Sequence, residues 1–198
     1  MTSFYDTQET RAPAEREAAL LAALPAQIAH ARSNAPAFST ILADVDPASV
    51  TSRAALARLP VTRKYELLER QQALRTDNVF GGFSAIGFGA AMPRVFCSPG
   101  PIYEPESARP DYWRMARAMY AAGFRPGELI HNSFSYHFVP AGSMMESGAH
   151  ALGCTVFPGG TGQTEQQVQA MAELRPVGYI GTPSFLKLIL EKAAELRQ

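Results

Sequence analysis

The stretch "RVFCSPGPIYEPE", residues 94–106, divides the sequence into two parts with different patterns. Residues 95–97 predict a short strand, and the proline-glycine pair that follows predicts a turn. Apolar residues then recur at helical spacing over 112–120, which predicts a helix. Because a strand that leads through a glycine turn into a helix is where many enzymes bind phosphate, the pattern indicates a candidate phosphate loop here.

Beyond this stretch, predicted strands and helices alternate along the chain. We expect strands near 95–97, 128–132, 154–157 and 177–180. Gly123 and Gly153 end two of the helices, Thr164 and Gln167 form a capping box that starts the next, and Thr182 caps the last. Alternation of this kind predicts an α/β fold in which helices flank a mostly parallel sheet.

The first part of the chain is helical and irregular. Residues 14–34 predict a helix that Pro25 kinks or divides, and 78–93 predict a loop rich in glycine and phenylalanine. We therefore divide the chain into a helical and irregular segment, 1–93, and an α/β subdomain, 94–198. The last residues, "TPSFLKLILEKAAELRQ", predict a helix without a stop signal, so we expect both parts to belong to one larger domain that continues past this sequence.

Composition excludes several classes of function. Hydrophobic residues make up 46% of the chain and charged residues 18%, which is typical of a globular protein rather than a disordered one. The 18 basic and 18 acidic residues balance, so we expect no nucleic-acid partner and no membrane partner. No apolar run is long enough to span a bilayer, the start has no signal-peptide pattern, and two cysteines do not suggest a disulfide framework. These features predict a cytoplasmic protein.

The sequence has no strong metal or nucleophile motif. His150 and Cys154 are four residues apart, a spacing that can hold a metal on a helix, but Gly153 lies between them and no second pair exists. Ser98 and Ser143 lack the G-x-S-x-G pattern of serine hydrolases. We therefore predict no metal site, and the catalytic residues are unassigned.

Ligands of open parallel sheets bind at the carboxyl ends of the strands, and four such ends can be recognised. They are "SPGPIYEPE", "HNSFSYHFVPAG", "PGGTGQTE" and "GTPS". All four are rich in glycine, serine, threonine or aromatic residues. Any one of them alone is equally typical of an ordinary loop and helix cap.

Taken together, these segments resemble the phenylacetate–CoA ligase group of the adenylate-forming (AMP-binding) superfamily. The resemblance covers about residues 58–198, and its specific part is 121–185. There the chain carries "AGFRPGE", "HNSFSY", "GTGQTE" and "TPS", in the order and at the spacing of the family's A-G-x-x-P-G-D, H-N-x-x-x-Y, G-Q-T-E and T-P-S elements. Before the phosphate loop, "LPVTRK" is similar to the family's leucine-proline-threonine-lysine segment.

The resemblance implies a two-step ligase reaction. A carboxylic acid, such as an aromatic one, attacks ATP to give an acyl-adenylate and pyrophosphate, and coenzyme A then takes the acyl group as a thioester. ATP, Mg²⁺ and CoA are therefore the implied cofactors. The resemblance also implies that the chain is only the N-terminal part of such an enzyme, so we expect the 198-residue chain alone to be inactive.

The phosphate loop departs from the family pattern. The family's loop runs Ser-Ser-Gly-Thr-Thr-Gly-Lys-Pro, and aligned without a gap this chain reads Ser98-Pro-Gly100-Pro-Ile-Tyr-Glu104-Pro105. Two prolines remove N–H donors, and Glu104 stands where the family has lysine, so a carboxylate would repel a polyphosphate. We therefore interpret Ser98, Gly100 and Glu104 as a degenerate nucleotide-binding loop. Glu104 could alternatively bind a metal or a cationic group, or face solvent near a helix N-terminus.

The second strand end matches the family's substrate pocket. Tyr136, Phe138, Ala141 and Gly142 align with the segment that lines the aromatic-acid pocket in the family. Aromatic and small residues can form a slot for a flat ring. The alternative is that the aromatic residues at 134, 136 and 138 simply alternate along a strand in the core.

Three hypotheses for function stay open on the sequence alone, because a fold by itself does not fix a function. The first is the N-terminal part of an aryl- or acyl-CoA ligase-like protein. The second is a non-catalytic or divergent paralogue that binds an aromatic acid, an acyl-CoA or a protein partner without adenylation. The third is a different acyl-transfer enzyme on the same scaffold. Self-association through the first part of the chain is a further expectation that nothing in the sequence selects.

Overall fold

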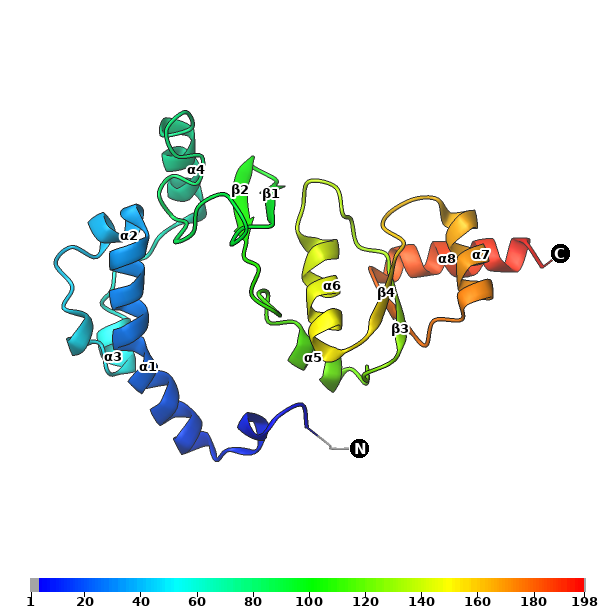
Figure 1. Cartoon of the computed structure of the whole chain (residues 1–198), viewed down its shortest axis with the longest axis horizontal. Helices are drawn as coiled ribbons and strands as arrows, with labels where there is room; N and C mark the ends of the chain where they lie inside the picture. The colour runs from blue at the N-terminus through cyan, green and yellow to red at the C-terminus, as the bar shows by residue number, and fades with distance from the viewer. Residues whose placement is uncertain (1–3, 198) are drawn as a thin grey trace. The chain divides into compact units, whose positions relative to one another are not determined.

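The computed structural model describes residues 4–197, which form two compact units. One unit runs from Asp6 to Ser107, and the other is built from the residues that follow it, together with Phe4 and Tyr5 at the start of the chain (Figure 1). The boundary that we expected between 93 and 94 falls inside the first unit, directly before a hairpin, and that division into domains stays a prediction. No helix within residues 4–197 has both the length and the apolar character that a membrane crossing requires.

The first unit is mainly helical. Its helices are α1 (Pro13–Asn34), α2 (Pro36–Ile41), α3 (Arg53–Leu56) and α4 (Lys64–Ala73), with short 3-10 turns at Thr7–Thr10 and Pro47–Ser49. Helix α1 continues through Pro25 without a break, so the expected division of this helix is wrong. A small core formed by Ile28, Leu42, Val50 and Ala55 joins α1, α2 and α3.

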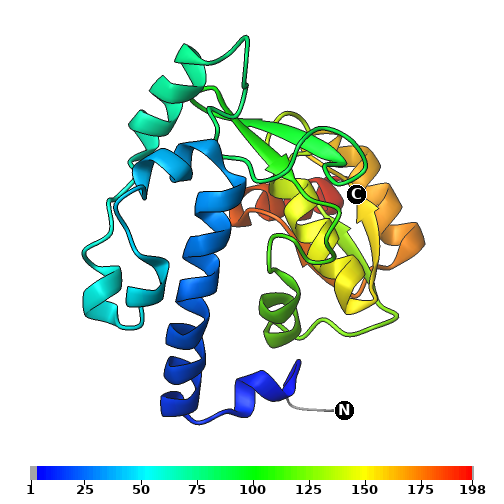
Figure 2. The same cartoon turned by 60° about the vertical axis from the view of Figure 1, so that its left-hand side comes forward.

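The stretch that begins at residue 94 forms a β-hairpin, which differs from the expected strand, turn and helix. Strand β1 (Arg94–Ser98) pairs antiparallel with β2 (Ile102–Glu106), as Figure 2 shows with two adjacent green arrows. The second strand forms because alternate residues of "IYEPE" bury one face: Ile102 and Glu106 are both buried. The expectation that 95–97 would join the parallel sheet is therefore wrong.

Polar contacts stabilise this hairpin at its open end and at the outer edge of β2. At its open end, an Arg94 guanidinium nitrogen lies 2.7 Å from a carboxylate oxygen of the buried Glu106. Along the outer edge of β2, the Gln71 side chain of α4 makes the hydrogen bonds that a neighbouring strand would make to Tyr103. It donates to the Tyr103 carbonyl and accepts from the Tyr103 N–H, each at 2.9 Å. These two hydrogen bonds satisfy the backbone groups of Tyr103 at the outer edge of β2.

The second unit has the predicted α/β architecture. After α5 (Ala116–Ala121) come β3 (Leu129–Asn132), α6 (Ala141–Leu152), β4 (Thr155–Pro158), α7 (Thr164–Leu174), β5 (Gly178–Ile180) and α8 (Pro183–Glu195). The three strands pair in the order β4-β3-β5, and both pairings are parallel. The expected strands near 128–132, 154–157 and 177–180 are confirmed, as is the fold class.

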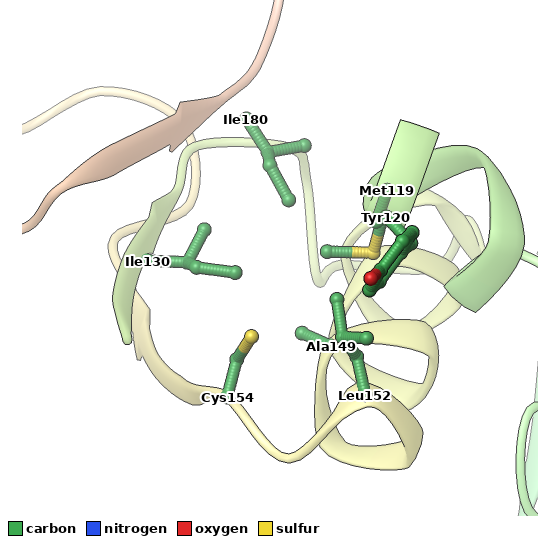
Figure 3. Close-up of a cluster of buried hydrophobic side chains, with 7 residues drawn as sticks. All are labelled: Met119, Tyr120, Ile130, Ala149, Leu152, Cys154 and Ile180. Carbon is green, nitrogen blue, oxygen red and sulfur yellow. The ribbon is translucent and has the colours of Figure 1, made fainter. Parts of the chain in front are cut away.

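The central strand β3 faces two different environments. Ile130 is fully buried and packs with Met119, Tyr120 and Leu152 of α5 and α6, with Cys154 and Ile180 also in this cluster (Figure 3). The next residue, His131, lies on the opposite face of the strand, where it contacts α7. Helices therefore cover both faces of the sheet, with α6 on one side and α7 on the other (Figure 1).

Candidate functional site

The candidate site lies at the carboxyl edge of the three-stranded sheet. Strands β3, β4 and β5 are parallel and end at Asn132, Pro158 and Ile180, so their ends meet at one edge. Three loops leave from this edge: 133–140, 159–163 and 181–182. Ligands of open α/β sheets bind at such edges, so the side chains that organise these loops determine the shape of the candidate site.

Asn132 organises the loop that follows β3. Its side chain is fully buried, and its amide nitrogen donates to the Tyr136 hydroxyl at 2.8 Å and to the Gly142 carbonyl at 2.9 Å. Its side-chain oxygen accepts from the Phe134 N–H at 3.2 Å. One carboxamide therefore fixes the turn after the strand, the Tyr136 side chain and the start of α6 together.

Gly142 allows the Tyr136 ring to lie against the first turn of α6. A Cβ atom at residue 142 would lie 2.8 Å from two Tyr136 ring carbons and 2.9 Å from the Ser135 carbonyl oxygen. Those separations are too short for a side chain, so this close approach requires glycine. The structure thus brings Tyr136 and Gly142 together, with Ala141 half-buried beside them.

Phe138 differs from Tyr136 and Gly142 in its exposure and in its backbone conformation. Its side chain is 80% exposed, and its backbone has a φ of 61°. A bulky residue in the left-handed region is uncommon and marks local strain, which is frequent in binding loops. Since β3 already ends at Asn132, the alternative in which residues 134, 136 and 138 alternate along a core strand is wrong.

A second polar group connects β3 to the loop after β4. Gln167 of α7 is buried, and its side-chain nitrogen faces the carbonyls of Gly162, Gly160 and Gly159 at 2.7, 3.0 and 3.3 Å. Its side-chain oxygen lies 2.7 Å from Nε2 of His131. Because the amide nitrogen must donate to the carbonyls, the oxygen is left to accept, so His131 carries its proton on Nε2.

The His131 ring is held on all sides. It stacks on Phe157 of β4 and Tyr179 of β5, with ring centroids 5.1 and 6.1 Å away. Burial lowers the pKa of His131 below its ordinary value of 6.5, although the hydrogen bond with Gln167 acts in the opposite direction. The neutral imidazole is therefore the form that this site favours.

The end of β5 is close-packed, like the surroundings of His131. The Ser133 hydroxyl donates to the Tyr179 hydroxyl at 2.6 Å and also lies 3.2 Å from the Ile180 carbonyl. Next to this contact, an apolar recess of about 300 Å³ lies between α5, α6 and β5 and reaches the carboxyl edge at Phe134 and Gly181. The edge thus combines polar groups from the loops with an apolar surface.

The predicted nucleotide-binding residues belong to the other compact unit. Ser98 pairs with Ile102 across the hairpin, so only three residues, Pro99 to Pro101, form the turn. Glu104 pairs with Phe96 in the middle of β2, so the alternative that Glu104 lies near a helix N-terminus is wrong. Within the turn, only Gly100 has a backbone N–H to offer a ligand.

Three residues that organise the carboxyl edge are not predicted as site residues from the sequence: Asn132, His131 and Gln167. Gln167 was assigned to a capping box with Thr164, but α7 begins after Gln163, and the Gln167 side chain turns inward to the glycine loop. That assignment is therefore wrong. The asparagine and histidine were visible in the H-N-x-x-x-Y pattern, which was interpreted only through its tyrosine.

Comparisons with known proteins find relatives that are phenylacetate-coenzyme A ligases. The phenylacetate-coenzyme A ligase of Aromatoleum evansii is 31% identical over 187 residues, which is 90% of this chain and 40% of that protein. The enzyme of the same name from Thermus thermophilus is 31% identical over 176 residues, which is 83% of this chain and 37% of that protein. No family model matches the chain.

Solved structures give the same result for the fold. A 2-hydroxyisobutyryl-CoA ligase in the postadenylation state, in complex with 2-HIB-AMP, superposes with a TM-score of 0.82 at 26% identity, over 93% of this chain and 40% of that one. An open conformation of that ligase, in complex with 2-HIB-AMP and CoA, has the same TM-score. The chain spans about two fifths of the length of the proteins it matches.

Proposed function

Since the chain is a phenylacetate–CoA ligase-like member of the adenylate-forming superfamily and corresponds to only part of such an enzyme, we propose that it is the N-terminal part of an acyl- or aryl-CoA ligase-like protein. In this role its α/β unit binds the carboxylic acid that is to be activated. The acid lies at the carboxyl edge of the β4-β3-β5 sheet.

The arrangement of Asn132, Tyr136 and Gly142 carries this proposal. The Tyr136 ring is held by a hydrogen bond from the buried Asn132 and by its close packing on Gly142, so it is a preorganised flat surface beside the strand end. Such a surface suits an acid with an apolar or aromatic group. Phe138 and Ala141 are the further residues proposed to line this pocket, and the exposed Phe138 would cover the bound acid.

The ligase-like role is favoured over a paralogue that binds without adenylation. Among the structures that this chain resembles, three hold 2-HIB-AMP, and two of these three also hold CoA. ATP, Mg²⁺ and CoA are therefore proposed as the cofactors of the complete activity. Within residues 4–197 no three His, Cys, Asp or Glu side chains are grouped as a metal site would require, so no magnesium ligands are assigned to this chain.

The hairpin turn does not fit the phosphates of ATP. A phosphate cradle needs several backbone N–H groups that converge on one point, whereas the turn between Ser98 and Ile102 has two prolines and one glycine. Glu104 adds a carboxylate on the adjoining strand. No step of the reaction is therefore assigned to Ser98, Gly100 or Glu104.

Calorimetric titration of the 198-residue chain tests the proposal. The probes are phenylacetate, 2-hydroxyisobutyrate and a phenylacetyl-sulfamoyladenosine, a stable analogue of an acyl-adenylate. We expect saturable binding of at least the last probe, and a loss of about tenfold in affinity in Tyr136→Ala, because an aromatic contact is worth about 1.5 kcal/mol.

Tyr65→Ala is the matched control. It removes an exposed tyrosine from the other compact unit and should leave the affinity unchanged. If none of the three probes binds, or if Tyr136→Ala binds the analogue as well as the unaltered chain does, the proposed acid site is wrong.

A further inference from the structure

We propose that Gln167 is a positioning residue of the candidate site. Its side chain holds the glycine loop, defined here as Gly159–Gly162, in the one arrangement that allows a ligand to bind at the carboxyl edge. The statement about ligand binding rests on the proposed function, whereas the statement about the loop can be tested without any ligand.

The glycine loop turns its carbonyl groups inward to a single side chain. Carbonyl oxygens of Gly159, Gly160 and Gly162 all lie within 3.3 Å of the Gln167 side-chain nitrogen. Gly160 and Gly162 have φ values of 66° and 77°, which only glycine adopts readily. Loss of the donor at residue 167 would remove all three of these contacts and make other conformations, of which glycines can reach many, more accessible to the loop.

Gln167 is itself rigidly held, which a positioning residue requires. Its backbone N–H donates to the Gln163 carbonyl in the first turn of α7, and its side-chain oxygen accepts from the His131 Nε2 proton. His131 is in turn enclosed by the rings of Phe157 and Tyr179. The loop is therefore anchored through Gln167 to the central strand of the sheet and not to a neighbouring loop.

The same loop is connected to the residue that positions Tyr136. The Gly160 N–H donates to the Asn132 carbonyl at 3.0 Å, and the Asn132 side chain donates to the Tyr136 hydroxyl. Displacement of the glycine loop would thus remove a restraint on the strand end that holds the proposed acid pocket. This sequence of contacts is the physical route by which a buried residue on α7 can change binding at the edge.

Glutamine is the side chain that fits both partners. It supplies N–H donors to the loop and an acceptor to His131, whereas glutamate keeps the acceptor and has no donor. There is also no room for a different loop residue, since a Cβ at Gly159 would lie 2.7 Å from His131 Nε2 and 2.9 Å from the Gln167 side-chain oxygen. Gln167→Glu therefore separates the two contacts: the contact with His131 is retained and the three contacts with the loop are lost.

The experiment compares Gln167→Glu with Gln166→Glu, the same chemical change at the exposed neighbouring position of α7. Nuclear magnetic resonance follows amide exchange of the glycine loop and the Nε2 proton of His131. Calorimetry follows the affinity for phenylacetyl-sulfamoyladenosine. In Gln167→Glu we expect faster exchange in the loop, a retained His131 Nε2 proton and an affinity lowered by at least about tenfold, with no change in Gln166→Glu.

Thermal unfolding and a second variant keep the test decisive if Gln167→Glu folds poorly. Gln167→Asn retains both the donor and the acceptor on a shorter side chain, and at low temperature it should recover part of the affinity that Gln167→Glu loses. If Gln167→Glu folds and binds the analogue as tightly as the unaltered chain, the positioning role is wrong while the proposed function stands. If the unaltered chain does not bind the analogue, the proposed function fails, and the role of Gln167 in ligand binding fails with it.

Discussion

Ser98 and Ile102 are direct cross-strand partners, and this pairing leaves a turn of only three residues in the segment where the sequence predicts a phosphate loop. The turn consists of Pro99, Gly100 and Pro101, so a single backbone N–H is available within it. We propose that the shortness of the turn, more than the charge of any one residue, keeps the phosphates of ATP from binding here.

We therefore predict that ATP binds this chain only at millimolar concentrations or more weakly. Each missing hydrogen bond to a charged phosphate costs about 1.5–3 kcal/mol, and several are missing. Isothermal titration with and without magnesium checks this. Glu104→Lys should leave the binding weak, since residue 104 pairs with Phe96 inside the hairpin and lies outside the turn. A micromolar dissociation constant for ATP would contradict the account of the turn.

The purified chain should also release no pyrophosphate when it is supplied with ATP, phenylacetate and CoA. The reason is that it spans about two fifths of the ligases that it resembles, and none of its described residues is assigned to the phosphates. A coupled pyrophosphate assay, with a full-length phenylacetate–CoA ligase as the positive control, makes the measurement. Release above the background of a heat-inactivated sample would overturn this prediction.

Gly142→Ala should destabilise the protein by about 1–3 kcal/mol, because the added methyl group would overlap the Tyr136 ring. Chemical denaturation measures the change in the free energy of unfolding. Gly87→Ala is the matched control, since a Cβ at that exposed position meets no atom within 4 Å. In the double variant Gly142→Ala/Tyr136→Ala the penalty at residue 142 should decrease but not vanish, because the Ser135 carbonyl oxygen would still lie 2.9 Å from the added methyl group. An undiminished penalty would show that the ring is not the cause.

Stability should fall in mild acid because of His131. Burial lowers the pKa of this histidine in the folded state below the value of 6.5 that it has when unfolded. The unfolded chain therefore binds the proton first, so the stabilising contribution is complete above pH 6.5 and is lost as the pH falls below that value. Urea denaturation between about pH 8 and about pH 5 tests the sign of this effect.

Two variants separate His131 from the other histidines. His131→Gln should weaken the dependence of stability on pH in this range, whereas His30→Gln, at an exposed position of α1, should leave the dependence unchanged. If the stability of the unaltered chain does not fall with acid, or falls equally in His131→Gln, then the buried imidazole is not responsible.

The local pattern of residues was sufficient to predict the three parallel strands. Strands β3, β4 and β5 lie within two residues of their predicted limits because each is a short apolar run between helix-capping residues, and those are properties of neighbouring residues. The resemblance of "HNSFSY" and "GTGQTE" to ligase motifs likewise needed no coordinates, and it identified the correct family.

The hairpin and the inner contacts of the site depended on residues that are far apart in the sequence. Strand β2 forms because Phe96 and Ile102 bury one face of the hairpin and because Gln71, more than 30 residues away, satisfies its outer edge. A glycine turn alone cannot distinguish such a hairpin from a turn that leads into a helix. Burial and hydrogen bonds to distant partners decide which of these two structures the segment adopts.

Gln167 shows most clearly that the local pattern of residues does not predict contacts between distant parts of the chain. Its spacing from Thr164 matches a capping box, and a local rule has no means to reject that match. Only the parallel pairing of β3 with β4 brings His131 and the glycine loop to the buried face of α7, where a side chain with both a donor and an acceptor satisfies them together. The local sequence determined the parallel strands β3, β4 and β5, whereas packing decided the hairpin and which buried polar groups meet, because a buried hydrogen bond depends on distance in space and not on distance along the chain.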